Sequence, residues 1–480
     1  MKLSVGGLRI AAAVAGVALL VAGCGSTTQG RAVSPLYDPF RAGGLAVQDG
    51  PSGIRGNAPA PEGDVKNGDG SDADKLATLA VNDVAEFWEK NYAESFNGSF
   101  TPVEDLVSYD SDDPSSPEIC GGETYQNPNA LFCQRDDLIA WDRGVLIPLG
   151  QHFFGDASIS ALLAHEYGHA VQDMANIAND DTPTIVSEQQ ADCLAGTYVR
   201  WVAEGQSPRF QLSTGDGLNH VLAGVLTLRD PTYGPADAPY LEQGHGTALD
   251  RISAFQMGFT SGASVCATID MDEITQRRGD LPLTLPQEST GDAASGDVTL
   301  TQDVVTSLVD VLGKVFQPDQ APTLSFDQPQ CSDAQPSPAA SYCPASNTIF
   351  VDMASLAEMG KPADRQDYSL LQGDNTALSV VTSRYALAVQ HARGESLDSA
   401  TAALRTACLT GVAQRAMAEN KDLALMLTAG DLDEAVAGLL TNGLVASNVN
   451  GETVPAGFTR IVAFRSGLGG NVDLCNARFK

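Results

Sequence analysis

The chain has 480 residues, of which 28 are basic and 60 acidic, and its net charge is −32. So acidic a protein is repelled by phosphate backbones and anionic lipids, which argues against nucleic acid as a partner. The length allows two or three domains with full hydrophobic cores.

Residues 1–23 have the pattern of a bacterial export signal. Lys2 and Arg9 are followed by a run of Ala, Val and Leu that is too short for an ordinary transmembrane helix. The sequence VAGC at 21–24 matches the lipobox cut by lipoprotein signal peptidase. We therefore expect Cys24 to be lipidated and to anchor the protein outside the bacterial cell membrane. The alternative is an ordinary secretory signal with an incidental cysteine.

The next segment, residues 24–75, is rich in Gly, Pro, Ser, Asn and Asp and has few large apolar residues. This composition predicts a disordered tether between the lipid and the folded part. Residues 1–23 hold two basic residues and no acidic ones, so their removal would change the net charge from −32 to −34.

A group of potential metal ligands and a potential general base begins at His165. His165 and His169 are four residues apart, so on a helix both imidazoles can face one metal ion. Glu166 lies about 100° around the same helix, where it can reach a metal-bound water as a general base. A catalytic Zn²⁺ needs a third ligand from elsewhere, and Glu188 is suited to this role. Asp192, one turn later, can accept the free N–H of a ligand histidine.

A helix is predicted around this motif, with Asp156 or Ser158 as its N-cap and apolar residues recurring at helical spacing. Gly168 sits in its middle and costs about 1 kcal/mol relative to alanine. Such a glycine indicates close approach of another backbone, and the helix carrying Glu188 is the candidate.

The chain also repeats itself. Four cysteines in each half match at offsets between 209 and 215: Cys120, Cys133, Cys193 and Cys266 with Cys331, Cys343, Cys408 and Cys475. Residues between them agree as well, since CLAG at 193–196 matches CLTG at 408–411. We infer two homologous domains, 76–288 and 289–480.

An even number of cysteines besides Cys24 predicts disulfides in an exported protein. The duplication favours bridges within each half: Cys120–Cys133, Cys193–Cys266, Cys331–Cys343 and Cys408–Cys475.

The second half lacks the metal-site residues. The positions of His165, Glu166, His169, Glu188 and Asp192 are taken by Ser383, Arg384, Leu387, Ala403 and Ala407. We therefore expect a degenerate copy that kept the fold and lost the chemistry.

Three segments, HEYGHAVQ at 165–172, EQQADCLAG at 188–196 and the stretch 245–266, together resemble the bacterial family of neutral zinc metallopeptidases. With the lipobox and the repeat, the chain is similar to mycobacterial-type lipoprotein peptidases. The resemblance implies an α+β, gluzincin-like fold with a small sheet whose edge strand, expected at Leu138–Trp141, flanks the cleft. It also implies that His165, His169 and Glu188 bind zinc and that Glu166 is the catalytic base.

His245 has two interpretations. It aligns with Val454 in the half without a metal site, which suggests that it serves the site, for instance by stabilising an oxyanion. It is equally interpretable as a capping or core histidine in a Gly-rich turn. Arg251 persists as Arg460 in the second half, so we expect a structural role such as an ion pair.

The predicted function is a membrane-anchored zinc metallopeptidase that hydrolyses extracytoplasmic peptides or proteins. One alternative is a zinc-stabilised binding or assembly lipoprotein without catalysis. Another is an amidase acting on peptide crosslinks of the cell wall, which would use the same metal chemistry.

Overall fold

The computed structural model describes residues 34–287, 296–328, 330–362 and 371–480. The export signal and Cys24 lie outside these residues. The fold is α+β as predicted, with long helices and small sheets. None of the helices in the described ranges combines the length and hydrophobicity needed to traverse a bilayer.

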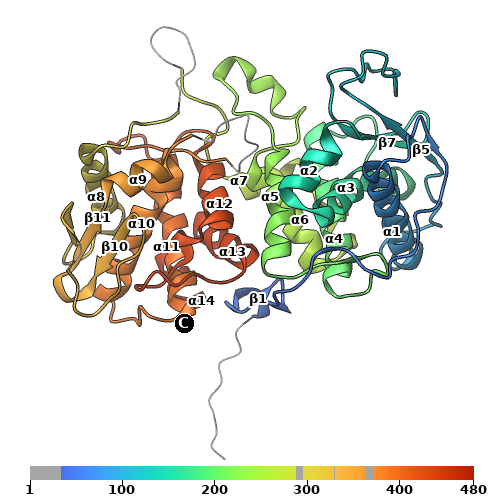
Figure 1. The fold of residues 1–480 in the computed structure, drawn as a ribbon. Helices are drawn as coiled ribbons and strands as arrows, with labels where there is room; N and C mark the ends of the chain where they lie inside the picture. Colours follow the sequence, from blue (N-terminus) through green and yellow to red (C-terminus); the bar gives the residue numbers. More distant parts are fainter. Residues whose placement is uncertain (1–33, 288–295, 329, 363–370) are drawn as a thin grey trace, which may run out of the picture. The chain divides into compact units, whose positions relative to one another are not determined.

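The first half, blue to green in Figure 1, places one four-stranded sheet beside a group of helices. Its strand order is β4-β5-β7-β6, in which β6 is antiparallel to β7 and the other pairs are parallel. The elements of this half are α1 (Asp72–Ser95), β5 (Asp105–Tyr109), β6 (Ala130–Cys133), β7 (Leu138–Asp142), α2 (Leu146–Phe154), α3 (Asp156–Ala175), α4 (Thr184–Ala203), β8 (Phe210–Gln211), α5 (Asp216–Thr227), η2 (Pro235–Tyr240), α6 (Ala248–Ser261), η3 (Ala263–Thr268) and α7 (Met271–Arg278).

The second half, yellow to red in Figure 1, follows a similar order. Its sheet has the order β10-β11-β9, with β9 parallel and β10 antiparallel to β11, the same relation that β5 and β6 have to β7. Its elements are α8 (Gln302–Phe316), β9 (Thr323–Ser325), β10 (Ala340–Cys343), η4 (Pro344–Ser346), β11 (Thr348–Val351), α9 (Met353–Met359), α10 (Asp374–Ala392), α11 (Ala400–Glu419), α12 (Asp431–Thr441), η5 (Leu444–Ala446), α13 (Gly457–Leu468) and α14 (Val472–Arg478).

All four predicted disulfides are confirmed. The bridges are Cys120–Cys133, Cys193–Cys266, Cys331–Cys343 and Cys408–Cys475, each within one half of the chain.

The tether predicted for 24–75 is wrong from Ser34 onward. This segment forms η1 (Pro35–Tyr37), a β1–β2 hairpin (Arg41–Ala42, Leu45–Ala46), β3 (Gly53–Ile54), β4 (Val65–Lys66) and the start of α1. Strand β3 pairs with β8, and β4 adds an edge to the main sheet. The segment has its own hairpin, pairs with distant strands through β3 and β4, and packs a few apolar residues such as Ala42 and Val65 on the core. Backbone pairing of this kind is not visible in the composition.

The expected edge strand is also corrected. Strand β7 forms as predicted, but it lies between β5 and β6 and all five of its residues are buried. The edge beside the motif helix α3 is β6, whose Phe132 contacts Glu166. Neighbours in a sheet are set by long-range pairing, so the local sequence pattern identified the strand and not its position.

Close helix contacts hold the motif helices. A Cβ at Gly168 would lie 3.1 Å from the Cα of Ala191, which confirms the predicted approach of α3 and α4. A Cβ at Gly258 of α6 would lie 1.7 Å from the carbonyl oxygen of Cys193. Helix α4 is therefore fixed between α3 and α6, with backbone contacts on both sides.

The N-terminal cap of α3 differs from the prediction. Its N-cap residue is Gly155, without a side-chain cap. Asp156 instead accepts a hydrogen bond from Gln151, and the Ser158 hydroxyl donates to the Phe154 carbonyl.

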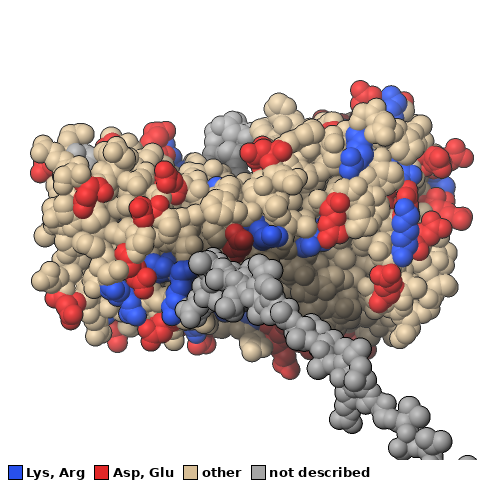
Figure 2. Space-filling view, turned by 90° about the horizontal axis from the view of Figure 1, so that it is seen from below, with Lys and Arg blue, Asp and Glu red and all other residues tan. Residues whose placement is uncertain are grey.

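The two halves also contact each other. The Asn219 side chain accepts a hydrogen bond from Gly457 N, at 2.9 Å. Gln256 donates to the Phe458 carbonyl and accepts from Arg465. On the surface, acidic side chains are spread across the face drawn in Figure 2 with basic ones among them.

A group of buried carboxyls lies where α10 and α12 begin. Asp374, Asp431 and Glu434 are each less than a tenth exposed. Burial and the neighbouring carboxyls raise the pKa of Glu434 from 4.5 to about 9 and that of Asp431 from 3.8 to about 7. Between about pH 4 and pH 9, the folded chain therefore keeps protons on these carboxyls that the unfolded chain has already released.

This group predicts a pH-dependent stability. Its stabilising contribution is fully present below about pH 4 and is lost as the pH rises through about 7 to 9. Glu434→Gln should therefore raise the free energy of unfolding at pH 8 by at least about 1 kcal/mol and leave it unchanged at pH 4. Denaturant titration in a chelator measures both values. The exposed Glu89→Gln is the control, and an equal gain at both pH values would contradict the prediction.

Candidate metal centre

Three of the predicted site residues bring their donor atoms together. His165 and His169 lie one turn apart on α3, and Glu188 comes from the first part of α4. Each offers one donor atom, and these atoms lie within 4.8 Å of one another. The group is largely enclosed, since the three side chains are between 7% and 20% exposed.

The spacing is close to that of a tetrahedral zinc site, with each histidine facing a different oxygen of Glu188. Donor atoms 2.0–2.2 Å from such an ion are separated by about 3.3–3.6 Å. His165 Nε2 lies 3.1 Å from Glu188 Oε2, and His169 Nε2 lies 3.6 Å from Glu188 Oε1. Two imidazoles and a carboxylate are the donor set of many catalytic zinc sites, in which the fourth position is left for water or substrate.

Asp192 orients the first histidine, as predicted. His165 Nδ1 lies 2.8 Å from Asp192 Oδ1, so the carboxylate fixes the Nδ1–H tautomer and leaves Nε2 free to bind metal. Burial alone would raise the pKa of Asp192, but Arg251 and His165 hold it below its usual value.

Arg251 is the ion-pair partner that fixes this carboxylate. It donates to both oxygens of Asp192, at 2.9 and 2.7 Å, and to the Leu228 carbonyl. The prediction of a structural ion pair for Arg251 is confirmed, with the addition that its partner contacts a metal-site histidine.

The site favours a positive charge at its centre. Burial lowers the pKa of His165, but Asp192 and Glu188 outweigh this effect and raise it to about 10. Burial would raise the pKa of Glu188, whereas hydrogen bonding and the charges of the nearby histidines bring it below its usual range. A divalent ion between these groups would supply the charge that they favour.

The orientation of His169 depends on a residue that the sequence did not single out. His169 Nδ1 lies 2.8 Å from Gln172 Oε1, while Gln172 Nε2 donates to the Ser187 carbonyl and to Gln190. The two donations of the amide fix its orientation, so its oxygen accepts from Nδ1–H and Nε2 faces Glu188. The i, i+3 spacing from His169 was the available signal.

Gln172→Ala should therefore weaken zinc binding by roughly 10- to 100-fold, because the imidazole loses the partner that fixes its tautomer. Competition with a fluorescent zinc chelator measures the change. The matched control is Gln390→Ala, which removes a buried glutamine from α10 of the second half. Equal zinc affinity in the two variants would rule out this role for Gln172.

Glu166 lies apart from the ligand group. It is buried, and its Oε2 accepts a hydrogen bond from the backbone N–H of Phe132 on β6, at 3.1 Å. Burial raises its pKa above the ordinary 4.5. This carboxyl is thus held by the backbone of the strand β6, and no hydrogen bond to either histidine is found among the described residues.

His245 lies at the rim of the site. Its Nε2 is 3.6 Å from Glu188 Oε2, and its side chain is 51% exposed. Asp230 accepts hydrogen bonds from the backbone N–H groups of His245 and Gly246 and thereby fixes this loop. His245 is therefore not a core histidine, and its half-exposed ring lies beside Glu188.

In the second half, buried arginines stand at the two positions that align in sequence with Glu166 and Arg251. Arg384, aligned with Glu166, is buried and donates to the Leu444 carbonyl and to Ser447. Arg460, aligned with Arg251, donates to carbonyl oxygens such as that of Leu439. Among the described residues Arg460 has no carboxylate partner, and the sequence position aligned with Asp192 is Ala407.

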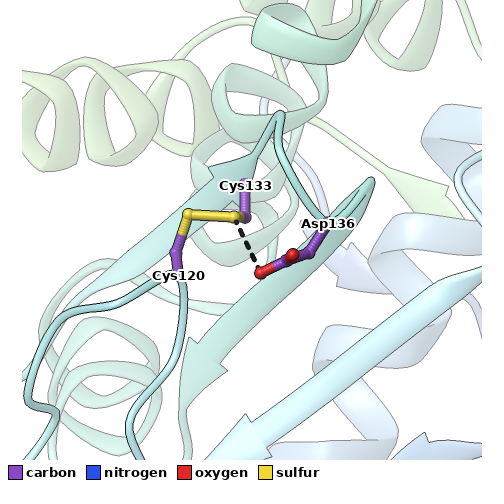
Figure 3. A group of neighbouring side chains, drawn as sticks. All are labelled: Cys120, Cys133 and Asp136. Atoms are coloured by element: carbon purple, nitrogen blue, oxygen red, sulfur yellow. Dashed lines mark hydrogen bonds between the residues drawn. A yellow bond between two sulfur atoms is a disulfide. The ribbon is translucent and has the colours of Figure 1, made fainter.

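Two further groups of potential donors are not metal sites. Figure 3 shows Cys120 and Cys133 joined to each other, with Cys133 Sγ 3.6 Å from an Asp136 oxygen. The bridge between Cys331 and Cys343 has the same kind of carboxylate neighbour, Asp333. Metal ions bind thiolates, and these sulfurs are used in disulfides.

The remaining histidines lie elsewhere. His220 is 51% exposed and lies beside Asp216. His391 is an exposed residue that contacts the Tyr342 hydroxyl, and His152 is exposed on α2.

Comparisons of the chain with protein-family models, with curated proteins and with solved structures find no match. Its function is therefore inferred from the geometry and chemistry of the site.

Proposed function

We propose that this chain is a zinc-dependent metallopeptidase that hydrolyses peptide bonds outside the cytoplasm and is anchored to the cell membrane through a lipid on Cys24. The first half would be the gluzincin-like catalytic domain, and the second half a degenerate copy that arose by duplication. The four disulfides agree with an oxidising compartment.

The main support for this proposal is that the three acidic residues of the site, Glu188, Asp192 and Glu166, have three different positions and contacts. Glu188 faces both imidazoles, Asp192 faces away from the ion position and orients His165, and Glu166 contacts neither histidine by hydrogen bond. A purely structural zinc site needs a ligand such as Glu188 and an orienting carboxylate such as Asp192, and no further acid. A separate buried carboxyl beside the donor group is what hydrolysis requires and what a binding lipoprotein has no use for.

In the proposed mechanism His165, His169 and Glu188 would hold a zinc ion. When bound, such an ion would lower the pKa of water to about 7 and polarise a carbonyl. Glu166 accepts a proton from the attacking water and later delivers it to the departing amine nitrogen. His245, from the rim, donates a hydrogen bond to the oxygen on which negative charge develops.

Strand β6 would bind the substrate. It is the edge of its sheet, and its Phe132 N–H points to Glu166 rather than to β7. An extended peptide added along this edge would be held by main-chain hydrogen bonds beside the catalytic carboxyl. Main-chain recognition of this kind favours peptides and unfolded protein segments as substrates.

The test is to incubate the purified protein with a mixture of peptides and to identify new termini by mass spectrometry. Cleavage should stop on addition of a chelator and return with Zn²⁺. Stoichiometric zinc without any new termini would favour the non-catalytic binding lipoprotein. Cleavage restricted to crosslinked cell-wall peptides would favour the amidase.

A further inference from the structure

Four acidic side chains from three segments of the second half converge at one place. Asp374 is the first residue of α10, and Asp431 and Glu434 lie in the first turn of α12. Asp297 joins them from the segment before α8. Carboxylate oxygens of Asp297, Asp374 and Glu434 lie within 4.8 Å of one another. Two oxygens on opposite sides of one Ca²⁺ ion are about 4.6–5.2 Å apart, so a single ion can contact all three carboxylates.

The charge of this group is not balanced by basic residues. Within the part of the chain that the structure describes, Asp374, Asp431 and Glu434 form no ion pair with a basic side chain, although each is less than a tenth exposed. Lys361 lines the hollow beside Asp374 but is paired with Glu358. Carboxylates buried to this extent are as a rule paired with a base or bound to a metal ion. A cation is therefore the component that would complete the group.

Asp374 has, in addition, a buried oxygen without a partner. Its Oδ2 accepts the backbone N–H of Val298, at 2.8 Å, whereas its Oδ1 has no hydrogen-bond donor among the residues that the structure describes. The side chain is only 5% exposed, and its carboxyl faces that of Glu434. A buried polar atom without a partner costs free energy, and a bound metal ion would satisfy it.

Glu434 is held against the start of α10 by backbone contacts. Its Oε2 accepts the N–H of Asn375, at 2.9 Å. A Cβ on Gly373 would lie 1.9 Å from its Oε1, so only glycine at this position leaves room for the carboxyl. The first residues of α10 thus fix a charged group of α12 beside Asp374.

The donor set favours calcium. All three donors are carboxylate oxygens, which suit Ca²⁺ and Mg²⁺, whereas Zn²⁺ is most often bound by His and Cys. A hollow of about 300 Å³, lined by Asp297 and Asp374, has room for water molecules that complete a shell of about 6–8 oxygens. Mg²⁺ demands near-ideal octahedral geometry at about 2.0–2.1 Å, while Ca²⁺ accepts irregular arrangements of ligands from several segments.

We propose that Asp297, Asp374 and Glu434 bind a Ca²⁺ ion, beside which Asp431 adds a further negative charge. The ion joins the chain that enters the second half to the first turns of α10 and α12, and it stabilises this half. The site shares no ligand with the zinc centre, and the inference does not depend on peptidase activity. The expected dissociation constant is that of extracellular calcium modules, about 10⁻⁴ to 10⁻³ M.

The first measurement is isothermal titration of the full chain with CaCl₂, after one equivalent of Zn²⁺ has been added. About 0.1 M KCl screens weak binding to the acidic surface. One Ca²⁺ per chain should bind, and more tightly than Mg²⁺. Asp374→Asn keeps an acceptor for the Val298 N–H but loses a charged ligand, so it should weaken Ca²⁺ binding at least about 10-fold. Wild-type affinity in this variant, or equal affinity for Mg²⁺, would overturn the calcium site.

The matched control is Asp156→Asn. Asp156 is the first residue of α3, as Asp374 is of α10, and its oxygens accept hydrogen bonds from Gln151 and from the backbone N–H of Ile54. In the described ranges it belongs to no group of potential metal ligands. This substitution should leave calcium affinity unchanged. Equal losses in the two variants would show a general effect of charge and would refute the site.

Thermal unfolding keeps the test decisive if Asp374→Asn does not fold. About 10 mM Ca²⁺ is roughly 10 to 100 times the expected dissociation constant and should raise the Tm of the wild type by about 2 °C or more over the same concentration of Mg²⁺. Glu434→Gln, which removes one charge from the buried group, should lose most of this shift. The proposal fails if Ca²⁺ does not shift the wild-type Tm, in which case protons alone balance the carboxyls. It also fails if the two proteins shift equally.

Discussion

Glu166→Gln is expected to lower kcat by roughly 10²- to 10⁴-fold while one zinc ion per chain stays bound. The amide has the size of the carboxyl and its oxygen can still accept the Phe132 N–H, so the site keeps its shape. It cannot take a proton from water near neutral pH, and this step is lost. Peptide cleavage rates and metal analysis of the same sample measure the two properties.

The control for this variant is Glu434→Gln, which makes the same change at a buried glutamate on α12, remote from the zinc-site residues in sequence. It should keep the wild-type rate per bound zinc. Full activity of Glu166→Gln would remove Glu166 from the mechanism, and loss of zinc together with activity would mean that its role is structural.

The second large effect concerns the ligand from α4. Glu188→Ala should weaken zinc binding by more than about 100-fold, since loss of a group that merely orients a ligand already costs 10- to 100-fold. The variant also removes the negative charge that faces both histidines. Equilibrium dialysis against buffered zinc, followed by metal analysis, gives the affinity.

Glu204→Ala, at the C-terminal end of the same helix, is the control. This residue pairs with Arg200 on the surface and should leave zinc affinity unchanged. Wild-type affinity in Glu188→Ala would show that the third donor is a different group, and the proposed ligand set would have to be abandoned.

The parts of the site that lie close in sequence were the most predictable. His165 and His169 follow from helical spacing, and the approach at Gly168 followed from the cost of a glycine within a helix. The disulfide pairs followed from the repeat of the cysteines. In each case the signal is a fixed interval along the chain.

Features set by long-range pairing were not predictable in this way. The order of strands placed β6 at the edge, and its Phe132 N–H on Glu166 is a backbone contact that any residue type could make. Residues 34–71 form short strands, of which β3 and β4 have partners far away in sequence. Backbone hydrogen bonds leave little trace in composition, so a segment poor in apolar residues looked disordered.

Gln172 is an intermediate case. Its position relative to His169 was visible, but glutamine at such a spacing is common on helices. Only the additional contacts with Ser187 and Gln190 on the neighbouring segment identify it as the group that orients the imidazole.

The helix contact at Gly258 has a further consequence. In the second half Gly467 has the same role, with a Cβ that would lie 1.8 Å from the Cys408 carbonyl oxygen. Yet α10 and α11 carry Ser383, Leu387 and Ala403 at the aligned positions of the metal ligands. These helices thus pack closely without the three residues that are proposed as zinc ligands in the first half. The apoprotein should keep its tertiary structure, unlike small zinc modules that unfold when stripped, and should regain full occupancy on simple addition of Zn²⁺.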